Sequence, residues 1–369
     1  MLEQYVQKNG KILRRGYTTG TCAAAAAKAA AAMLFSGRKI NEVEVTLPIG
    51  EKIVLKIVDA RLDKNYAQCC VVKDAGDDPD VTHGAKICAR VRKTKCSVVI
   101  SGGEGVGAVT KRGLQIPVGE AAINSVPRQM ILQEAGKVLP YGNGAEITIF
   151  VPAGEELAKK TLNEKLGILG GISIIGTTGI VEPMSEEAFR ASLVPQIDVA
   201  LANGYDEIIL TPGRIGEANA IAKGIPEDAI VQMGNFVGFM LEECAKRGVK
   251  KILLFGHVSK LAKIAAGFFN THSKFGDAKP EIAASALRCA DEKIAKLLLE
   301  ANTTEEAVEI LREKNLMQVF DLIAQKASER ATEHVNGKIE IGTILVSLKS
   351  GVVGKDKNAR ASKWAKFLL

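Results

Sequence analysis

The stretch GYTTGTCAAAAAKAAAA, residues 16–32, decides how the first part of the chain folds. Alanine is the best helix former, so the alanine run predicts a helix that Thr19 or Thr21 can cap and Gly37 can end. Its small side chains allow close packing on a sheet. Threonine hydroxyls and glycines at the positive end of a helix could also seat an anion, and on spacing alone a capped helix explains the motif equally well.

Downstream of this helix, apolar and polar residues alternate over short segments, as in strands of a sheet that has one face in water. A second helix is expected to begin near Pro127. Because strands and helices do not alternate regularly here, we expect an α+β domain over residues 1–153. Its expected strands cover residues 42–47, 52–58, 68–73, 87–91, 97–100 and 146–151.

Beyond Pro152 the pattern changes to short, almost wholly apolar strands separated by helices, which indicates a parallel sheet buried on both faces. With right-handed crossovers this predicts an α/β Rossmann-like domain, residues 154–348, with a mostly parallel, doubly wound sheet. Residues 349–369 are expected to form a solvated basic tail. The expected strands cover residues 172–175, 207–210, 229–232, 251–255 and 338–348.

The composition indicates a globular protein of two domains and argues against nucleic-acid-binding and membrane proteins. The 369 residues allow two domains at roughly 150 residues each, and 47% hydrophobic with 25% charged residues is ordinary for a globular protein. Aromatic residues make up 5% and are not interleaved with basic residues, which argues against nucleic-acid binding. No run of about 18 strongly apolar residues predicts a membrane segment, so we expect a cytoplasmic protein. The net charge of +7 favours an anionic ligand, and the seven scattered cysteines are expected to be reduced.

The segment Asp74–Gly84, between two expected strands, is dense in carboxylates. Four aspartates and one histidine fall within ten residues, so their mutual repulsion must be offset or used to raise pKa values. The closing glutamate of a calcium-binding EF-hand is absent. Turn chemistry alone could explain such a loop, but we favour acid–base chemistry or hydrogen bonding to a substrate.

Glycine- and threonine-bearing loops follow the first four expected strands of the second domain, at the carboxyl ends where ligands bind in such folds. They are residues 176–183, 211–217, 234–235 and 256–260, and the last contains His257. In the first domain, the glycine-rich loop 101–107 is followed by Lys111, Arg112 and Arg128, which could hold carboxylates. The sequence lacks a Walker loop, a nucleophile elbow and zinc-ligand spacing.

The opening motif and five later blocks, in the same order, resemble the CbiD family of C-methyltransferases of anaerobic cobalamin biosynthesis. The resemblance runs from about residue 13 to about residue 345. The sequence departs from the family where Glu104 and Ser125 replace proline and Ser259 replaces glycine, which leaves the local loop conformations open. The later blocks are residues 74–84, 102–113, 119–130, 211–217 and 256–273.

This resemblance implies methyl transfer from S-adenosylmethionine to C-1 of cobalt-precorrin-5B, which gives cobalt-precorrin-6A. Cobalt arrives inside the substrate, so no protein-bound metal is expected, and the chain could form a homo-oligomer. We place the donor against the second domain, in a cleft between the domains. The expected donor contacts are Gly176, Thr177, Thr178, Gly179 and Glu182.

We assign proton handling to Asp77, Asp78 and His83, with His257 as a further candidate. Two rival functions stay open: a non-catalytic tetrapyrrole carrier, and an enzyme that acts on a phosphorylated metabolite and uses the glycine loops as phosphate cradles. Binding of S-adenosylmethionine would separate both from a methyltransferase. The expected contacts to the tetrapyrrole carboxylates are Thr18, Thr19, Thr21, Lys111, Arg112, Arg128, His272 and Ser273.

Overall fold

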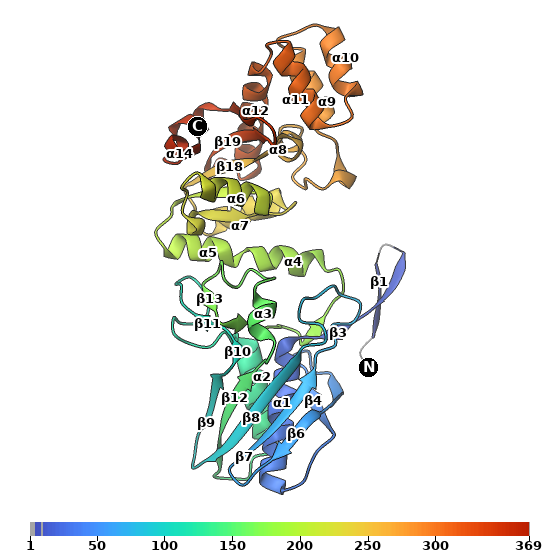
Figure 1. Ribbon diagram of the computed structural model, residues 1–369, viewed down its shortest axis with the longest axis vertical. Helices are drawn as coiled ribbons and strands as arrows, with labels where there is room; N and C mark the ends of the chain where they lie inside the picture. The colour runs from blue at the N-terminus through green and yellow to red at the C-terminus, as the bar shows by residue number, and fades with distance from the viewer. Residues whose placement is uncertain (1–3, 9, 369) are drawn as a thin grey trace. The chain divides into compact units, whose positions relative to one another are not determined.

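The computed structural model describes residues 4–8 and 10–368 and divides into two compact units, Met1–Glu186 and Glu187–Leu369. Figure 1 colours unit 1 from blue to green and unit 2 from yellow-green to red. The division lies beyond the boundary predicted after residue 153. The cause is a pairing far apart in sequence: the strand expected at 172–175 is β14 (Gly171–Ile172), which runs parallel to β10 (Gly105–Val106) inside unit 1.

Unit 1 is built on a five-stranded sheet in the order β6-β7-β8-β12-β9. Neighbouring strands are antiparallel except for β9, which runs parallel to β12. The predicted α+β arrangement is confirmed as a mostly antiparallel sheet with helices packed against it. The strands are β6 (Val58–Leu62), β7 (Tyr66–Val72), β8 (Lys86–Thr94), β9 (Val98–Gly102) and β12 (Gly144–Phe150).

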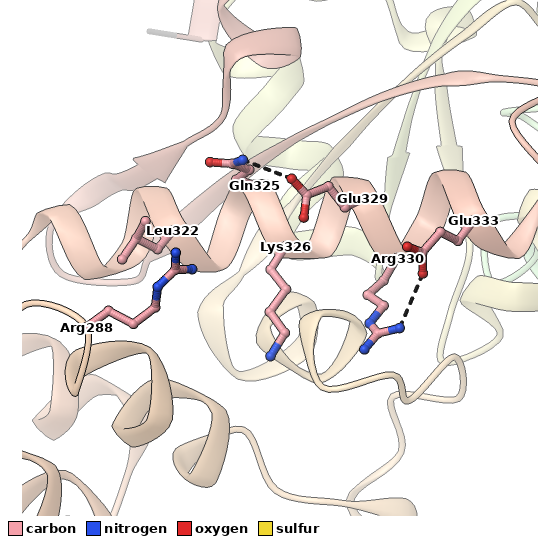
Figure 2. A pocket seen from close by; sticks show the side chains of 7 residues that line it. All are labelled: Arg288, Leu322, Gln325, Lys326, Glu329, Arg330 and Glu333. Atoms are coloured by element: carbon pink, nitrogen blue, oxygen red, sulfur yellow. Dashed lines mark hydrogen bonds and ion pairs between the residues drawn. The ribbon is translucent and has the colours of Figure 1, made fainter.

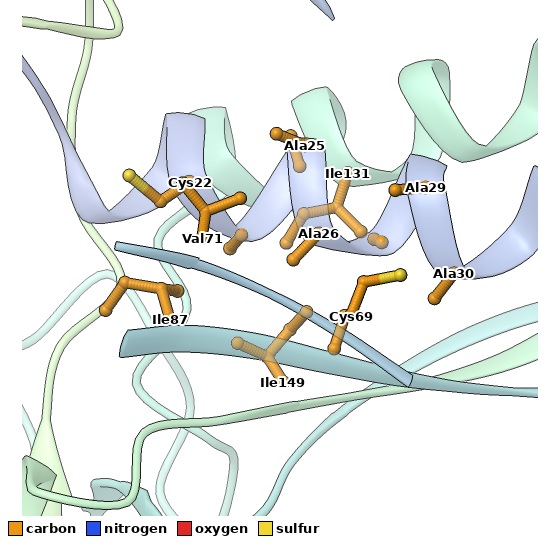
Figure 3. Close-up of a cluster of buried hydrophobic side chains, with 14 of the residues drawn as sticks. Cys22, Ala25, Ala26, Ala29, Ala30, Cys69, Val71, Ile87, Ile131 and Ile149 are labelled. Carbon is orange, nitrogen blue, oxygen red and sulfur yellow. The ribbon is translucent and has the colours of Figure 1, made fainter. Parts of the chain in front are cut away.

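The alanine run forms α1 (Thr19–Ser36), which packs on this sheet and on α2 (Ser125–Gly136). Figure 3 shows its alanines lying over side chains of the sheet such as Cys69 and Ile149. The eight alanines from Ala23 to Ala31 have no exposed surface, because methyl groups let the helix backbone approach the strands closely. The N-cap is Thr18 rather than the predicted Thr19 or Thr21, and Gly37 ends the helix with φ 71° as predicted.

Smaller elements complete unit 1. Besides the main sheet there are two hairpins, β1–β2 and β4–β5, a short parallel pair, β10–β14, and a short antiparallel pair, β11–β13. In addition, β15 pairs with β3 at the start of α1. The elements are β1 (Tyr5–Lys8), β2 (Lys11–Arg14), β3 (Gly16–Tyr17), β4 (Glu42–Thr46), β5 (Lys52–Lys56), β11 (Ala108–Val109), α3 (Gly154–Ala158), β13 (Ile168–Leu169) and β15 (Ile180–Val181).

Unit 2 contains a second five-stranded sheet in the order β17-β16-β18-β19-β20. The first four strands are parallel and β20 is antiparallel to β19, so the predicted mostly parallel sheet is confirmed. All five residues of β16 are buried, as expected for a strand covered on both faces. The strands are β16 (Glu207–Thr211), β17 (Ile230–Gln232), β18 (Lys251–His257), β19 (Glu340–Ser347) and β20 (Gly351–Lys355).

The C-terminal segment is not the solvated tail that its charge predicted. It supplies β20 and two short helices, and Trp364 and Leu368 are buried in the core of unit 2. Its lysines stay at the surface while its few apolar residues provide the anchor. The helices of unit 2 are α4 (Glu186–Leu193), α5 (Pro195–Ala202), α6 (Arg214–Ala222), α7 (Val237–Lys246), α8 (Val258–Ala265), α9 (Lys279–Ala286), α10 (Glu292–Glu300), α11 (Thr304–Glu313), α12 (Gln318–His334), α13 (Lys357–Ala361) and α14 (Ala365–Leu368).

One expectation about the cysteines is wrong. Cys70 of β7 and Cys88 of β8 are direct cross-strand partners and form a disulfide, whereas all seven cysteines were expected to be reduced. The sequence gives no register between the two strands, so it could not show that these side chains face each other. Within residues 4–8 and 10–368, no helix combines the length and the apolar character that crossing a bilayer requires.

Candidate functional site

Three segments of unit 1 meet at the N-terminus of α1. They are β3, the acidic loop 74–84, and the segment 173–184 that contains β15. The contact is tight: a Cβ atom at Gly16 would lie 2.1 Å from the carbonyl carbon of Ala75, so only glycine fits there. This convergence brings together residues that the sequence analysis had assigned to separate sites.

The threonines at this helix end hold the segment 173–179 in place. The Thr21 hydroxyl donates to the Gly179 carbonyl at 2.7 Å, and the Thr18 amide donates to the same oxygen at 3.1 Å. The Thr19 hydroxyl accepts from the Ile175 amide at 2.9 Å. All three threonines are buried. Their hydroxyl groups therefore serve the fold at this end of α1.

The glycine–threonine loop predicted to contact the donor belongs to unit 1, not to the parallel sheet of the second domain. A Cβ atom at Gly176 would lie 2.3 Å from the Thr18 hydroxyl oxygen, and Gly176 has φ +133°. Thr177 and Thr178 are exposed. Glu182 accepts from Arg15 Nε at 3.2 Å and lies 3.8 Å from a lysine Nζ, so cations already balance its charge.

Basic and backbone donors offset the charges of the acidic loop. Asp74 accepts two hydrogen bonds from the Arg14 guanidinium, at 2.7 and 2.8 Å, and this contact lowers the pKa of the Asp74 carboxyl below its usual value. Asp77 accepts from the Arg14 amide at 2.7 Å, and Asp78 accepts from the Met184 amide at 2.8 Å. The two predicted catalytic aspartates are thus hydrogen-bond acceptors that fix the loop.

His83 keeps one ring nitrogen available. Its Nδ1 accepts a hydrogen bond from the Ala75 amide at 3.1 Å, so the proton of the neutral ring sits on Nε2. The side chain is exposed, and Nε2 has no partner among the residues that the structure describes. The loop below it is anchored by Asp80 and the buried Lys73, which lie 2.6 Å apart. His83 is therefore held in place with its Nε2–H group facing solvent.

The cations predicted in the first domain differ in their surroundings. Lys111 Nζ donates to the Lys165 carbonyl at 3.0 Å, so its ammonium is held by a segment 54 positions later in the chain. Arg128 lies 3.4 Å from Glu120 and also donates to a backbone carbonyl, while Arg112 is exposed. Arg112 and Arg128 remain able to meet a carboxylate from solvent.

In unit 2, His257 ends β18 and caps α8. Its Nδ1 accepts from the Ser259 amide at 3.1 Å, so Nε2 carries the proton and donates to Glu305 Oε1 at 2.6 Å. Ser259, which stands where the family was expected to have glycine, also places its hydroxyl 2.6 Å from Nδ1. Both ring nitrogens are occupied, so the ring links the start of α8 to α11.

Glu305, in the first turn of α11, ties His257 to the end of β19. It accepts from the Ser347 hydroxyl at 2.7 Å and the Leu348 amide at 3.0 Å. Burial alone would raise the pKa of Glu305, but these donors together with His257 lower it below its usual value. Glu305 could not be predicted from the sequence, because no short motif links it to a histidine 48 positions away.

His272 and Ser273, predicted to bind substrate, lie on an exposed turn of unit 2, whereas the other predicted substrate residues belong to unit 1. The His272 Nδ1 accepts from the Lys274 amide at 3.2 Å. Beside them, Lys260 and Lys263 of α8 both donate to the Thr271 carbonyl. Lys263 was not singled out in the sequence, because a lysine in a helix gives no sign that it will be buried.

A cavity of about 350 Å³ lies along α12, apart from every predicted site residue. Figure 2 shows two pairs among its polar side chains, Gln325 with Glu329 and Arg330 with Glu333. It is a solvated helix face and no candidate for catalysis. Among the described residues, no three His, Cys, Asp or Glu side chains gather in a way that could hold a metal ion. The lining residues are Arg288, Leu322, Gln325, Lys326, Glu329, Arg330 and Glu333.

Comparisons with known proteins agree with the division into units. Residues 6–183 match the CbiD family model, and residues 270–357 match the model of the CbiD C-terminal domain. A cobalt-precorrin-5B C(1)-methyltransferase of Moorella thermoacetica is 51% identical over 352 residues, which are 94% of this chain and 96% of that protein. One from Methanocaldococcus jannaschii is 48% identical over 92% of this chain and 95% of that protein.

A crystal structure of a cobalamin biosynthesis protein (cbiD) from Archaeoglobus fulgidus is 34% identical and covers 74% of this chain and 86% of that one. Its TM-score of 0.40 establishes no common arrangement by itself. The sequence identities extend over nearly the full length of both bacterial and archaeal relatives. The chain therefore belongs to the CbiD family.

Proposed function

We propose that this protein transfers a methyl group from S-adenosylmethionine to C-1 of cobalt-precorrin-5B and releases cobalt-precorrin-6A. The observation that carries the proposal is the 51% identity, over 94% of this chain, to a relative that bears the name of this activity. The net charge of +7 suits a substrate that carries several carboxylates. Cobalt is part of the substrate and needs no ligand from the chain. The cytoplasm is the proposed location, because the methyl donor is an intracellular metabolite.

The reaction is a displacement at the methyl carbon of the donor. C-1 of the ring supplies an electron pair to form the new carbon–carbon bond, the carbon–sulfur bond breaks, and its electron pair stays on sulfur as S-adenosylhomocysteine. Holding the two reactants in line can supply much of the rate. The task of the protein is therefore to place a sulfonium and a large anionic ring at a fixed distance.

We propose that the donor binds to unit 2 rather than at the loop of Gly176 and Gly179. Numbered along the chain, the strands of this sheet run 2-1-3-4-5, the flavodoxin-like doubly wound order, in which ligands bind where the strand order reverses. That point lies between β16 and β18. Thr211 Oγ1, at the carboxyl end of β16, is buried without a partner among the described residues, so an added polar group there would satisfy it.

For the tetrapyrrole we propose Arg112 and Arg128 of unit 1 as carboxylate contacts. Arg112 is exposed and Arg128 has only long contacts, so either guanidinium can reorient toward a carboxylate. We propose that His83 donates a hydrogen bond from Nε2 to the substrate near C-1, rather than accepting a proton that Nε2 already carries, because this N–H group is exposed and the ring is fixed through Nδ1. The proton that methylation releases passes to solvent. Asp77 and Asp78 support this histidine by holding the loop.

Calorimetry with S-adenosylhomocysteine tests the donor site. A Cβ atom at Gly213, on the loop after β16, meets nothing within 4 Å, and the backbone is extended, so Gly213→Val should fold normally. We expect it to weaken binding by about 10-fold or more, since the new side chain would fill the donor space. Gly136→Val, on an exposed helix end in unit 1, is the control.

Thr177→Phe fills the alternative loop of unit 1 and should leave donor binding unchanged. If Thr177→Phe abolishes binding and Gly213→Val does not, the donor site lies in unit 1 and this placement is wrong. A wild-type chain that binds the tetrapyrrole but no S-adenosylhomocysteine would be a carrier. A chain that binds phosphate compounds and neither of these ligands would support the phosphorylated-metabolite alternative.

A further inference from the structure

Two lysines of α8 converge on one backbone carbonyl with no carboxylate beside them. Lys260 Nζ donates to the Thr271 carbonyl at 3.3 Å and Lys263 Nζ donates to the same oxygen at 3.2 Å. Lys260 also donates to the Asn235 side-chain oxygen at 2.9 Å. Each of these acceptors is neutral. The cluster therefore carries two positive charges and no negative charge from the described residues.

This lack of a counter-charge distinguishes the cluster from the other buried lysines of the chain. Lys263 is only 6% exposed, and burying an ammonium without an anion is costly. Lys73, which is 1% exposed, lies 2.6 Å from Asp80, and the partly buried Lys28 lies 2.7 Å from Glu134. Burial and the neighbouring Lys263 lower the pKa of Lys260, as expected where the positive charge is not balanced.

The position of the cluster points to a ligand. α8 begins directly after β18, and Lys260 lies in its first turn, where the helix end adds positive potential. Lys260 and Asn235 are only partly buried, so solvent reaches this side of the cluster. An incoming anion could thus meet the ammonium of Lys260 while Lys263 supports it from inside.

We propose that Lys260 and Lys263 form an anion site that binds a carboxylate of one of the two reactants. The identity of the ligand rests on the proposed function, while the anion site itself does not. The carboxylate could come from the amino-acid end of the methyl donor or from an acid side chain of the tetrapyrrole. Both present the same chemical group to two ammonium groups, so the test must separate them.

The test measures binding to the full chain by calorimetry for two matched pairs of ligands. S-Adenosylhomocysteine has a carboxylate, and 5′-methylthioadenosine lacks it. Cobyrinic acid is a cobalt corrin with free carboxylates, and its methyl ester lacks them. We expect Lys260→Met to weaken one of the two acids about 10-fold or more and to leave its carboxylate-free counterpart unchanged. The acid that loses affinity identifies the source.

Lys296→Met is the matched control, because Lys296 is 78% exposed on α10 of the same unit and changes the net charge equally. It should bind every ligand as the wild type does. Lys263→Met should act like Lys260→Met; if it does not fold, Lys260→Met decides, since Lys260 is only partly buried. The proposal is overturned if Lys260→Met binds both acids with wild-type affinity.

A failure of the proposed function would look different. In that case the wild type would bind neither S-adenosylhomocysteine nor cobyrinic acid. Citrate then probes the anion site alone: it should raise the melting temperature of the wild type and of Lys296→Met, but not that of Lys260→Met. Equal stabilisation of all three proteins by citrate would overturn the anion site.

Discussion

The single charge in the alanine helix offers a sharp test of how unit 1 is held together. Lys28 Nζ lies 2.7 Å from Glu134 of α2, whose side chain is only 2% exposed. The same carboxylate accepts from Lys137 and from the Thr46 amide, and Lys28 also donates to the Glu44 carbonyl at 2.6 Å. Changing Glu134→Gln keeps the shape of the side chain and removes its charge.

The expected effect follows from burial. Removing one partner of a buried ion pair leaves the other charge unpaired, which destabilises a protein by about 3–5 kcal/mol. Lys28 is 14% exposed and keeps its bond to the Glu44 carbonyl, so we expect the lower end, about 3 kcal/mol. That corresponds to a decrease of roughly 100-fold in the ratio of folded to locally unfolded α1. Replacing both partners, in Lys28→Met with Glu134→Met, should recover part of the loss.

Native-state hydrogen exchange with mass spectrometry measures the loss of stability of α1 separately from the rest of the chain. Amides of α1 should exchange roughly 100-fold faster in Glu134→Gln, while those of β18 in unit 2 should not change. Glu156→Gln is the control, because its partner Lys159 is well exposed and the pair should contribute nothing measurable. If the amides of α1 exchange at the same rate in both variants, the buried pair does not stabilise this helix.

The same pair predicts a pH dependence. Burial would raise the pKa of Glu134, but the bonds from Lys137, Lys28 and the Thr46 amide lower it below its usual value. A folded-state pKa below the unfolded one stabilises the protein above the unfolded pKa, and that stability is lost as the pH falls through the folded pKa. The wild type should therefore lose its advantage over Glu134→Gln below about pH 4, and keep it at neutral pH.

Three further outcomes are expected. Gly16→Ala should lower the free energy of unfolding by about 1–3 kcal/mol in urea titrations, because the new methyl group meets the Ala75 backbone; unchanged stability would refute the tight contact. His83→Ala should reduce kcat about 100-fold with little change in KM, because the substrate loses a hydrogen-bond donor near C-1, and full turnover between about pH 6 and 8 would remove its proposed role. Glu305→Gln should lower stability by about 1–3 kcal/mol, because His257 loses a charged acceptor, and a wild-type urea midpoint would contradict this.

Local features of the fold could be predicted from the sequence, whereas long-range pairings could not. The helix over the alanine run depends on residues next to one another, and Gly37 stops it by its own conformational freedom. The division between the units depends on β14, which pairs with a strand more than 60 positions earlier. No local pattern contains that information. The buried Trp364 was likewise hidden within a basic segment that looked solvated.

The candidate site followed the same rule. The loops after β16 and β18 were expected at the edge of a parallel sheet, because strand polarity alone puts carboxyl ends together. The partners of these loops were not expected. Glu305 accepts from His257, and the Thr271 carbonyl accepts from two lysines of α8, only because the later segments of the chain fold back onto the loops. Thr18, Thr19 and Thr21 were predicted to bind substrate because of their hydroxyl groups, but these groups are buried and hydrogen-bonded within unit 1.

Methyl transfer itself is the most direct measurement. The purified chain is incubated with cobalt-precorrin-5B and S-adenosylmethionine that carries a deuterated methyl group, and the macrocycle is read by mass spectrometry and NMR. We predict one labelled methyl group, on C-1, in the product and one S-adenosylhomocysteine released for each. A macrocycle that binds to the protein but gains no label, or gains it at another carbon, would contradict this prediction.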